Sequence, residues 1–187
     1  LDPAMLDRLG PAMNSGKAIF VYGAPGTGKT FITQRLARLF HDTCLIPHAI
    51  AIGDTVVRVF DPSVHRQFQD NSPVVMLNHG HDPRYVLCTR PQIITGGELT
   101  ADMLEVQFDP ATRQYRAPLQ LKANGGMLLL DDLGRQRIPP LTVLNRWILP
   151  MEEGVDYLSM NTGQHFRTPF DVILVFSTNL HPQDLVD

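Results

Sequence analysis

The sequence predicts an α/β fold in which a mostly parallel sheet carries helices on both faces. Three short apolar runs predict buried core strands, at Ala18–Tyr22, Met127–Leu130 and Val172–Phe176. The first run leads into a glycine-rich loop, and apolar residues three or four apart then predict an amphipathic helix over Lys29–His41. A strand, a glycine loop and a helix in this order are the start of an α/β domain.

Composition and charge are those of an ordinary globular protein. A length of 187 residues with 43% hydrophobic and 19% charged residues predicts one domain that needs no disulfide or metal to fold. The formal charge of -3 does not favour nucleic acid or a membrane surface as a partner. Two cysteines without a CxxC pair favour reduced thiols. Because no apolar run reaches the roughly 20 residues of a membrane span and no secretory signal opens the sequence, we expect a cytoplasmic protein.

A helix and a hairpin are predicted between the two later core strands. Pro139–Pro140 open the helix, Pro150 is expected to kink its end, and Gly154 is expected to stop it. The apolar stripe of this helix comprises Leu141, Leu144, Ile148 and Met151. Trp147 lies beside the stripe and is expected to pack rather than to stack on a ligand, and Tyr157–Arg167 predicts a hairpin.

Two further stretches of the α/β core, which we take to span residues 1–187, lie between the first two core strands. Residues 44–90 predict a β-rich insertion, and residues 96–117 predict a helix followed by a hairpin. The strands expected in this part of the chain are Thr55–Phe60, Pro73–Leu77, Arg90–Thr95, Val106–Phe108 and Gln114–Arg116. The short helix is expected at Gly97–Leu104.

The glycine loop matches a phosphate-binding pattern. Gly23–Thr30 reads GAPGTGKT, which satisfies G-x-x-x-x-G-K-[ST] at every fixed position. Glycines let successive backbone N–H groups point inward around an anion, and the helix that follows adds its positive end. Lys29 is expected to reach the β- and γ-phosphates of ATP, and Thr30 is expected to bind Mg²⁺. The residues expected to contact the nucleotide are Gly23, Ala24, Pro25, Gly26, Thr27, Gly28, Lys29, Thr30 and Phe31.

Polar residues follow the other two core strands. Asp131 and Asp132 end the run Met127–Leu130, and Asn179 ends the third core strand. Ligands of α/β sheets sit at the carboxyl ends of the strands. We therefore expect Asp131 to support Mg²⁺, Asp132 to act as base toward the attacking water, and Asn179 to bond the γ-phosphate and that water. The alternatives are an acidic strand-to-loop turn for the aspartates and an Asx turn for Asn179.

Two other polar clusters are weaker candidates. His79-Gly-His81-Asp82 has close metal-ligand spacing but no third or fourth partner nearby, which favours a solvated turn. Arg135 and Arg137 follow the acidic pair and could face the nucleotide of a neighbouring subunit, although a solvated loop is favoured.

The order of these motifs resembles that of AAA+ ATPases. The resemblance rests on the P-loop Gly23–Thr30, the acidic strand Leu128–Asp132 and the strand end Ser177–Asn179. Within AAA+ the chain is most similar to the MoxR-like branch, with its relatives of magnesium chelatase. Lys122–Asp132 resembles that branch's approach to its acidic motif, and Gly96–Arg116 resembles the helix and hairpin inserted in its second helix.

The resemblance implies Mg²⁺-dependent ATP hydrolysis in a homo-oligomeric ring, often a hexamer, that remodels a client protein. It also implies that Lys29 and Thr30 bind phosphate and magnesium, that Asp131 supports magnesium and that Asn179 is the sensor. Two departures bear on catalysis. Asp132 stands where the family has glutamate, and neither the arginine after the sensor strand nor the helical lid is found in this chain.

Three other functions stay open from the sequence. A nucleotide-gated switch with little turnover shares every binding motif. A small-molecule kinase shares the P-loop but needs an acceptor pocket and an arginine-bearing lid, and the segment Ala123–Asp132 together with Asn179 argues against it. Remodelling of DNA is disfavoured by the weak net charge.

Overall fold

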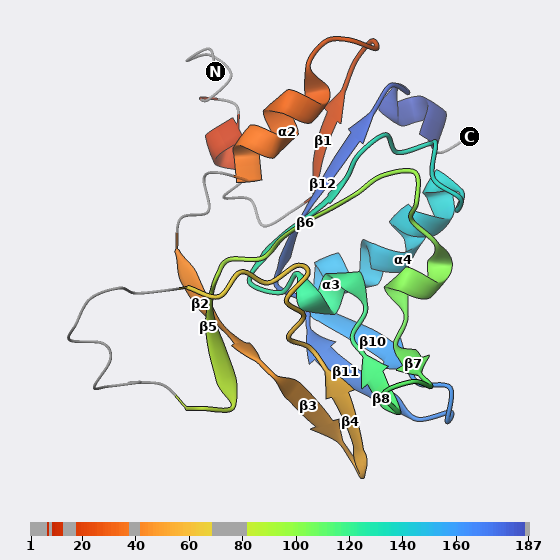
Figure 1. Ribbon diagram of the computed structural model, residues 1–187. Coiled ribbons are helices and arrows are strands. Elements are labelled where there is room, and N and C mark those ends of the chain that lie inside the picture. The colour runs from red at the N-terminus through yellow and green to blue at the C-terminus, as the bar shows by residue number, and fades with distance from the viewer. Residues whose placement is uncertain (1–6, 8, 13–17, 38–41, 69–81, 186–187) are drawn as a thin grey trace, which may run out of the picture.

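The structure is a computed structural model, which describes residue 7 and residues 9–12, 18–37, 42–68 and 82–185. Its core is a parallel sheet in the order β1-β12-β9-β6 (Figure 1). These strands are Ile19–Tyr22 (β1), Val172–Thr178 (β12), Gly126–Leu130 (β9) and Gln92–Thr95 (β6). Every pair in this sheet runs parallel, so the carboxyl ends of all its strands meet at one edge.

Helices cover both faces of this sheet, which confirms the predicted α/β architecture. Side chains alternate along β9, with Met127 and Leu129 packed on the side of α2 (Lys29–Ala37), in a cluster that includes Leu36. Leu128 and Leu130 pack on the other side with α4 (Pro140–Glu153), through a cluster that includes Trp147. All five residues of β9 are buried, as a central parallel strand requires.

The first core strand is parallel as expected, but the expectation that it is buried is wrong on one side. Within the described sheet β1 lies at an edge, and its alternate residues Phe20 and Tyr22 are 38% and 53% exposed. Phe20 nevertheless stacks on Phe176 of β12, with 4.8 Å between the ring centroids. An edge position exposes this strand although its sequence is as apolar as that of a central strand.

Helix α4 ends where the sequence predicts, but it buries a different face. Gly154 adopts a left-handed backbone with φ of 68° and its N–H bonds to the carbonyl of Pro150, which ends the helix. The buried residues of α4 are Val143, Trp147 and Pro150. Of the expected stripe, Leu144 and Met151 pack at the margin of the core, whereas Leu141 and Ile148 are 42% and 47% exposed. The packing of Trp147 is confirmed, and a kink at Pro150 stays a prediction.

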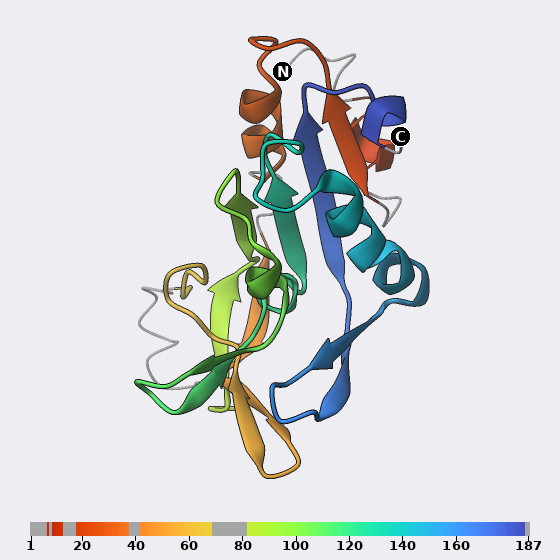
Figure 2. The same cartoon turned by 90° about the vertical axis from the view of Figure 1, so that its right-hand side faces the viewer.

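A second group of strands lies beyond the amino ends of the core strands (Figures 1 and 2). Two paired strands, Thr43–Pro47 (β2) and Tyr85–Thr89 (β5), run antiparallel. A four-stranded sheet has the order β3-β4-β8-β7, with strands Ala49–Ile52 (β3), Thr55–Arg58 (β4), Gln114–Arg116 (β8) and Gln107–Asp109 (β7). The hairpin of Val155–Ser159 (β10) and His165–Pro169 (β11) completes the group. A separate apolar cluster that includes Val57, Cys88, Tyr115 and Leu158 joins these strands.

Among the described residues, the strand expected at Gln114–Arg116 is found with the same bounds, and the one expected at Val106–Phe108 is found at Gln107–Asp109. The strands expected at Thr55–Phe60 and Arg90–Thr95 are shorter, and the second of them belongs to the core sheet as β6. The strands β2, β3 and β5 are missing from the expectations, as is the short helix Leu119–Lys122 (α3). The expected helix at Gly97–Leu104 is a single 3₁₀ turn, Ala101–Leu104 (η2), and a second turn, Pro182–Leu185 (η3), follows β12. The expected strand Pro73–Leu77 and the residues His79 and His81 lie outside the described part of the chain. Among the described helices, none has the length and apolar character that crossing a membrane requires.

Candidate active site

The glycine loop lies at the carboxyl end of β1, where the parallel strands of the core sheet end (Figure 1). Gly26 and Gly28 have φ of 80° and 82°, a backbone region that side-chain-bearing residues rarely adopt. Helix α2 begins directly after them, and the N–H of Ile32 donates to the carbonyl of Gly28 at 3.0 Å. The glycines thus shape a loop that ends on a helix N-terminus, as an anion cradle requires.

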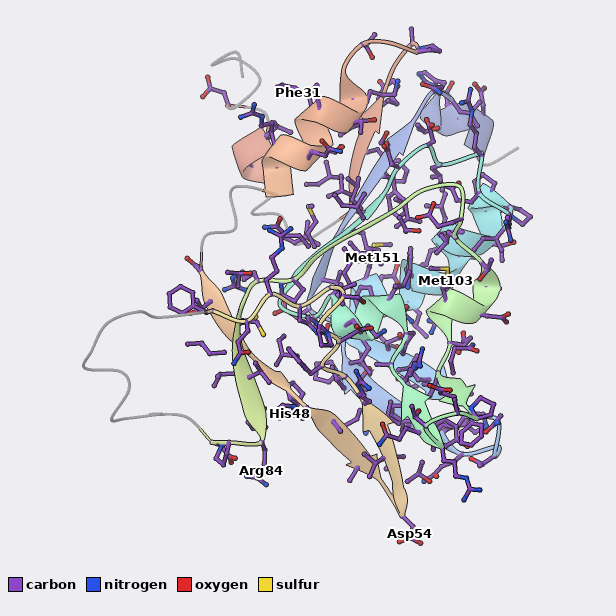
Figure 3. The ribbon with its side chains drawn as sticks, in the orientation of Figure 1. Phe31, His48, Asp54, Arg84, Met103 and Met151 are labelled. Atoms are coloured by element: carbon purple, nitrogen blue, oxygen red, sulfur yellow. The ribbon has the colours of Figure 1, made fainter. Side chains whose placement is uncertain are left out.

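The ammonium of Lys29 lies inside this loop. Its Nζ donates to the carbonyl oxygens of Gly23 and Ala24, both at 2.9 Å, and only 8% of the residue is exposed. Thr27 closes the loop further, because its hydroxyl donates to the Ala24 carbonyl at 2.8 Å. Phe31 points outward on α2 (Figure 3), and the guanidinium of Arg35 lies 4.8 Å from the centroid of its ring.

Asp131 joins the loop to the core sheet. Its Oδ2 accepts from the hydroxyl of Thr30 at 3.0 Å, and these two residues are 101 positions apart. Its Oδ1 accepts from the hydroxyl of Ser177 at 2.6 Å and from the N–H of Asp132 at 3.2 Å. The carboxylate that follows β9, the P-loop threonine and a serine of β12 therefore form one cluster of oxygen atoms.

Asp132 adopts a left-handed backbone with φ of 54°. The Nδ2 atom of Asn179 lies 3.4 Å from its Oδ1, and an Arg135 nitrogen lies 3.9 Å from its Oδ2. Arg135 is largely exposed, in line with the solvated loop that the sequence favours, although it also faces the acidic pair. The structure thus brings Asp132 and Asn179 together beside Asp131.

Further bonds hold the segment after β9 against β12. The side-chain amide of Gln136 donates to the Asp131 carbonyl, and Gln136 accepts from the N–H of Gly134, both at 2.8 Å. The N–H of Leu133 donates to the carbonyl of Ser177 at 2.7 Å, and the hydroxyl of Thr178 donates to the carbonyl of Leu133 at 2.7 Å. Sequence reasoning did not assign Ser177 or Gln136 to the site. The polar residues at the end of β12 are visible in the sequence, but the partner of each hydroxyl is not.

A third carboxylate, Glu98, lies after β6 at the same sheet edge. It accepts from the N–H of Gly96 at 2.9 Å and from the hydroxyl of Thr95 at 3.1 Å. The Gly96 backbone bond is the main cause that lowers the pKa of Glu98, so the group is ionised at neutral pH. The carboxyl edge of the core sheet therefore carries carboxylates next to the loop that holds Lys29, and such an edge suits a cation.

The oxygen atoms at this edge fit Mg²⁺ better than a transition metal. Within the described ranges, no group of three or more His, Cys, Asp or Glu side chains could hold a metal alone. Mg²⁺ needs no such group, because it is held by one or two carboxylates together with substrate phosphates and water. Asp131 and the hydroxyl of Thr30, 3.0 Å apart, are donors of that kind.

Comparisons with known proteins find similarity in structure only. No protein-family model and no curated protein matches the sequence. One similar solved structure is a complex between subunits BchI and BchD of magnesium chelatase, with a TM-score of 0.54 and 18% identity over 96% of this chain. Another is NtrX from Brucella abortus, with a TM-score of 0.49, 13% identity, and coverage of 97% of this chain and 31% of that one.

The magnesium chelatase structure bears on the fold alone. The present chain spans 54% of that chain's length, so the two share the α/β architecture over roughly half of the larger protein. The parallel sheet between helices, which the sequence predicts, is the part that the comparison supports.

Proposed function

We propose that the chain binds ATP with Mg²⁺ through Gly23–Phe31 and hydrolyses it as the core of an AAA+ ATPase of the MoxR-like, magnesium-chelatase-related branch. One observation carries this proposal: the hydroxyl of Thr30 lies 3.0 Å from the carboxylate of Asp131. A glycine-rich turn that matches the phosphate-binding pattern by chance is not expected to place its threonine against a carboxylate 101 positions later. The shared fold with the magnesium chelatase structure supports the proposal.

Each site residue has a distinct role in this mechanism. The Lys29 ammonium, now bonded to loop carbonyls, turns to the β- and γ-phosphates. Thr30 and Asp131 would hold Mg²⁺, which supplies positive charge to the phosphate oxygens when bound. Asp132 accepts a proton from the attacking water, and Asn179 orients that water through its amide.

The variant Lys29→Ala tests nucleotide binding. We expect it to abolish the heat of Mg²⁺–ATP binding in titration calorimetry, because it removes the main cation at the β- and γ-phosphates. Gln34→Ala is the matched control, since Gln34 is an exposed residue of the same helix. The control should bind as the unmodified chain does.

Unchanged ATP affinity in a folded Lys29→Ala protein would contradict the site. Thermal melting without nucleotide checks folding. Absence of ATP-induced stabilisation in the unmodified chain would contradict the proposal as a whole.

A second candidate function, a nucleotide-gated switch with little turnover, is favoured by the geometry of Asp132. Its carboxylate is one methylene shorter than glutamate and is already near Asn179 and Arg135. We expect Asp132→Glu to raise the rate of phosphate release several-fold, because the longer side chain reaches the water directly, with Asp132→Asn as the uncharged control. Binding of ATP without phosphate release in both the unmodified chain and Asp132→Glu would favour the switch.

We further propose a ring of subunits, in which a neighbour's arginine completes each site and the insertions at residues 44–90 and 96–117 contact a client protein in the cytoplasm. An arginine supplied in this way is worth roughly a thousandfold or more in phosphoryl transfer, so an isolated subunit would turn over slowly. The similar magnesium chelatase structure is a complex of two kinds of subunit, which is consistent with assembly.

A further inference from the structure

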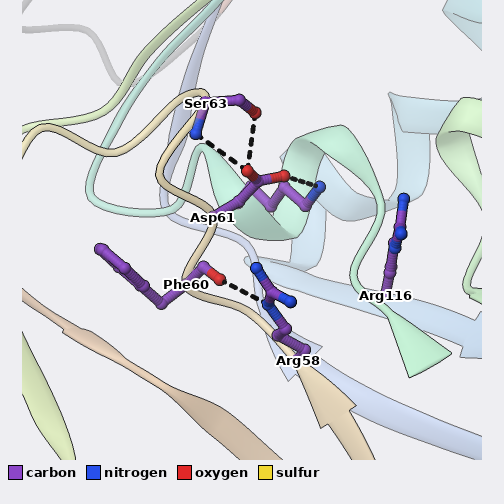
Figure 4. Close-up of a pocket in the computed structure, with 6 residues that line it drawn as sticks. Arg58, Phe60, Asp61, Ser63 and Arg116 are labelled. Carbon is purple, nitrogen blue, oxygen red and sulfur yellow. Dashed lines mark hydrogen bonds and ion pairs between the residues drawn. The ribbon is translucent and has the colours of Figure 1, made fainter. Parts of the chain in front are cut away.

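A polar hollow lies among the β3-β4-β8-β7 sheet, α3 and the segment after β4, separate from the candidate active site (Figure 4). Its volume is about 250 Å³. The residues that line it are Arg58, Phe60, Asp61, Ser63, Arg116 and Lys122. None of them belongs to the P-loop or to the Asp131 cluster, so the proposed ATP site does not account for it.

Two arginines are paired side by side in this hollow. Arg58 of β4 and Arg116 of β8 are register partners on neighbouring parallel strands. Like charges directly opposite each other on a sheet destabilise it. Arg116 is balanced by an ion pair with Asp109 of the adjoining strand. Arg58 bonds through Nε to the carbonyl of Phe60 at 3.2 Å, and no carboxylate among the described residues pairs with it.

The third cation, Lys122, is already balanced. Its Nζ lies 2.8 Å from Oδ2 of Asp61, whose Oδ1 accepts from the N–H and the hydroxyl of Ser63 at 3.0 and 2.6 Å. Burial raises the pKa of Asp61, but the hydrogen bonds from Lys122 and Ser63 together lower that pKa by more. The net shift is downward, so the carboxyl stays ionised. The lining residues carry three positive charges and one negative charge, and Asp109 balances a second of the cations, so one positive charge, that of Arg58, stays unbalanced.

The buried side chain of His65 ties two of the lining residues, Asp61 and Lys122, together without a ligand. The Nδ1 atom of His65 accepts from the N–H of Asp61 at 2.9 Å, and its Nε2 lies 2.8 Å from the carbonyl of Lys122. His65 is buried and its ring stacks on Phe60. The segment after β4 is therefore tied to α3, and the hollow is held in shape without a ligand.

We propose that this hollow binds the phosphate group of a small molecule, with Arg58 and Arg116 as the recognising residues. Guanidinium groups present paired N–H donors that match phosphate oxygens, and the unbalanced positive charge of Arg58 favours an anion. A volume of about 250 Å³ is below the roughly 300–1,000 Å³ typical of drug-sized ligands, so the occupant is compact.

A neighbouring hollow distinguishes two sources of the phosphate group. It measures about 350 Å³, shares Arg58 and Phe60 with the first, and is also lined by His48 and Val56. The organic part of a phosphomonoester would lie there, whereas inorganic phosphate would use the first hollow alone.

Titration calorimetry of the full chain with inorganic phosphate tests the proposal. Lys29→Ala serves as the starting protein, because it weakens phosphate binding at the P-loop. We expect Arg58→Gln, and separately Arg116→Gln, to weaken phosphate binding at least tenfold. Arg167→Gln is the matched control, since Arg167 is an exposed strand arginine outside both hollows. Equal melting temperatures in phosphate-free buffer show that the variants fold.

Phenyl phosphate is the second probe. Binding at least tenfold tighter than that of inorganic phosphate, and equally sensitive to Arg58→Gln, assigns the hollow to a phosphomonoester. Equal affinities assign it to free phosphate. The proposal is overturned if neither probe binds to the Lys29→Ala protein, or if Arg58→Gln and Arg116→Gln bind as tightly as Arg167→Gln. The two results that overturn the proposal do not depend on whether the P-loop binds ATP.

Discussion

At the scale of single residues, Asp131 is the centre of the candidate active site. The parallel register explains why Ser177 reaches it: Phe176 is the partner of Leu130, so Ser177 stands beside the next residue, Asp131. The same serine is the partner of Val21 near the end of β1. A hydroxyl near the end of a strand carries no sequence signal of its own, and its role emerges only when β12 is placed between β1 and β9.

Removing the Ser177 hydroxyl should impair the metal site more than nucleotide binding. We expect Ser177→Ala to raise the Mg²⁺ concentration for half-maximal phosphate release about tenfold, because groups that orient a metal ligand contribute roughly 10- to 100-fold to metal affinity. ATP affinity should stay within about twofold. The measurement is phosphate release as a function of Mg²⁺ at saturating ATP.

Ser159→Ala is the control for this experiment, because its hydroxyl bonds to His165 at the far hairpin. An unchanged Mg²⁺ requirement in Ser177→Ala would show that the 2.6 Å bond to Asp131 does not position the carboxylate.

At the scale of elements, the start of β9 depends on a glycine for close packing. A Cβ on Gly126 would overlap the carbonyl of Pro91, and that carbonyl accepts from the N–H of Met127 at 2.9 Å. Only a residue without a side chain lets β6 begin this close to β9. Gly126 therefore sets the spacing of these two core strands.

Gly126→Ala should destabilise the fold. Forcing the strands apart costs roughly 1–3 kcal/mol or more, and each kcal/mol lowers Tm by roughly 2–4 °C in a chain of this size. Gly10→Ala is the matched control, because a Cβ there meets no atom within 4 Å. The measurement is the thermal melting temperature of both variants. Equal melting temperatures would show that Gly126 does not have to lie this close to the carbonyl of Pro91.

The same scale shows where sequence reasoning fails. The core strands and the P-loop could be predicted because long-range packing and local pattern agree there. The sequence does not predict the strand Thr43–Pro47, because its apolar residues reach the second apolar cluster only by pairing with Tyr85–Thr89, far along the chain. In α4 the periodicity predicts that Ile148 faces the sheet, but the larger side chain of Trp147 is buried there and Ile148 is exposed. Pairing partners and helix rotation are set by tertiary contacts that periodicity does not contain.

At the scale of the whole molecule, a partly buried ionic network joins the two apolar cores. Arg146 of α4 binds Asp156 of β10 at 2.7 Å and Glu105, after η2, at 3.2 Å. Gln120 of α3 donates to Asp156 at 3.0 Å. Burial lowers the pKa of Arg146, but the neighbouring carboxylates raise it above its usual value, so it stays charged. Trp147 belongs to the core-sheet cluster and Leu158 to the other, so this network spans both.

Breaking the network should uncouple the two cores. Asp156→Ala removes the most buried partner of Arg146 but leaves Glu105, so we expect a loss below the roughly 3–5 kcal/mol of a fully unpaired buried charge. The double variant Arg146→Met/Asp156→Leu should recover much of that loss. Urea unfolding followed by the fluorescence of Trp147, the one tryptophan in the sequence, reports the core sheet, and circular dichroism reports the whole chain. We expect the two transitions to coincide in the unmodified chain and to separate in Asp156→Ala, because the network no longer links the cores. Asp184→Ala, at an exposed site, should leave them coincident. If Asp156→Ala unfolds like this control, the cores are coupled by apolar contacts alone.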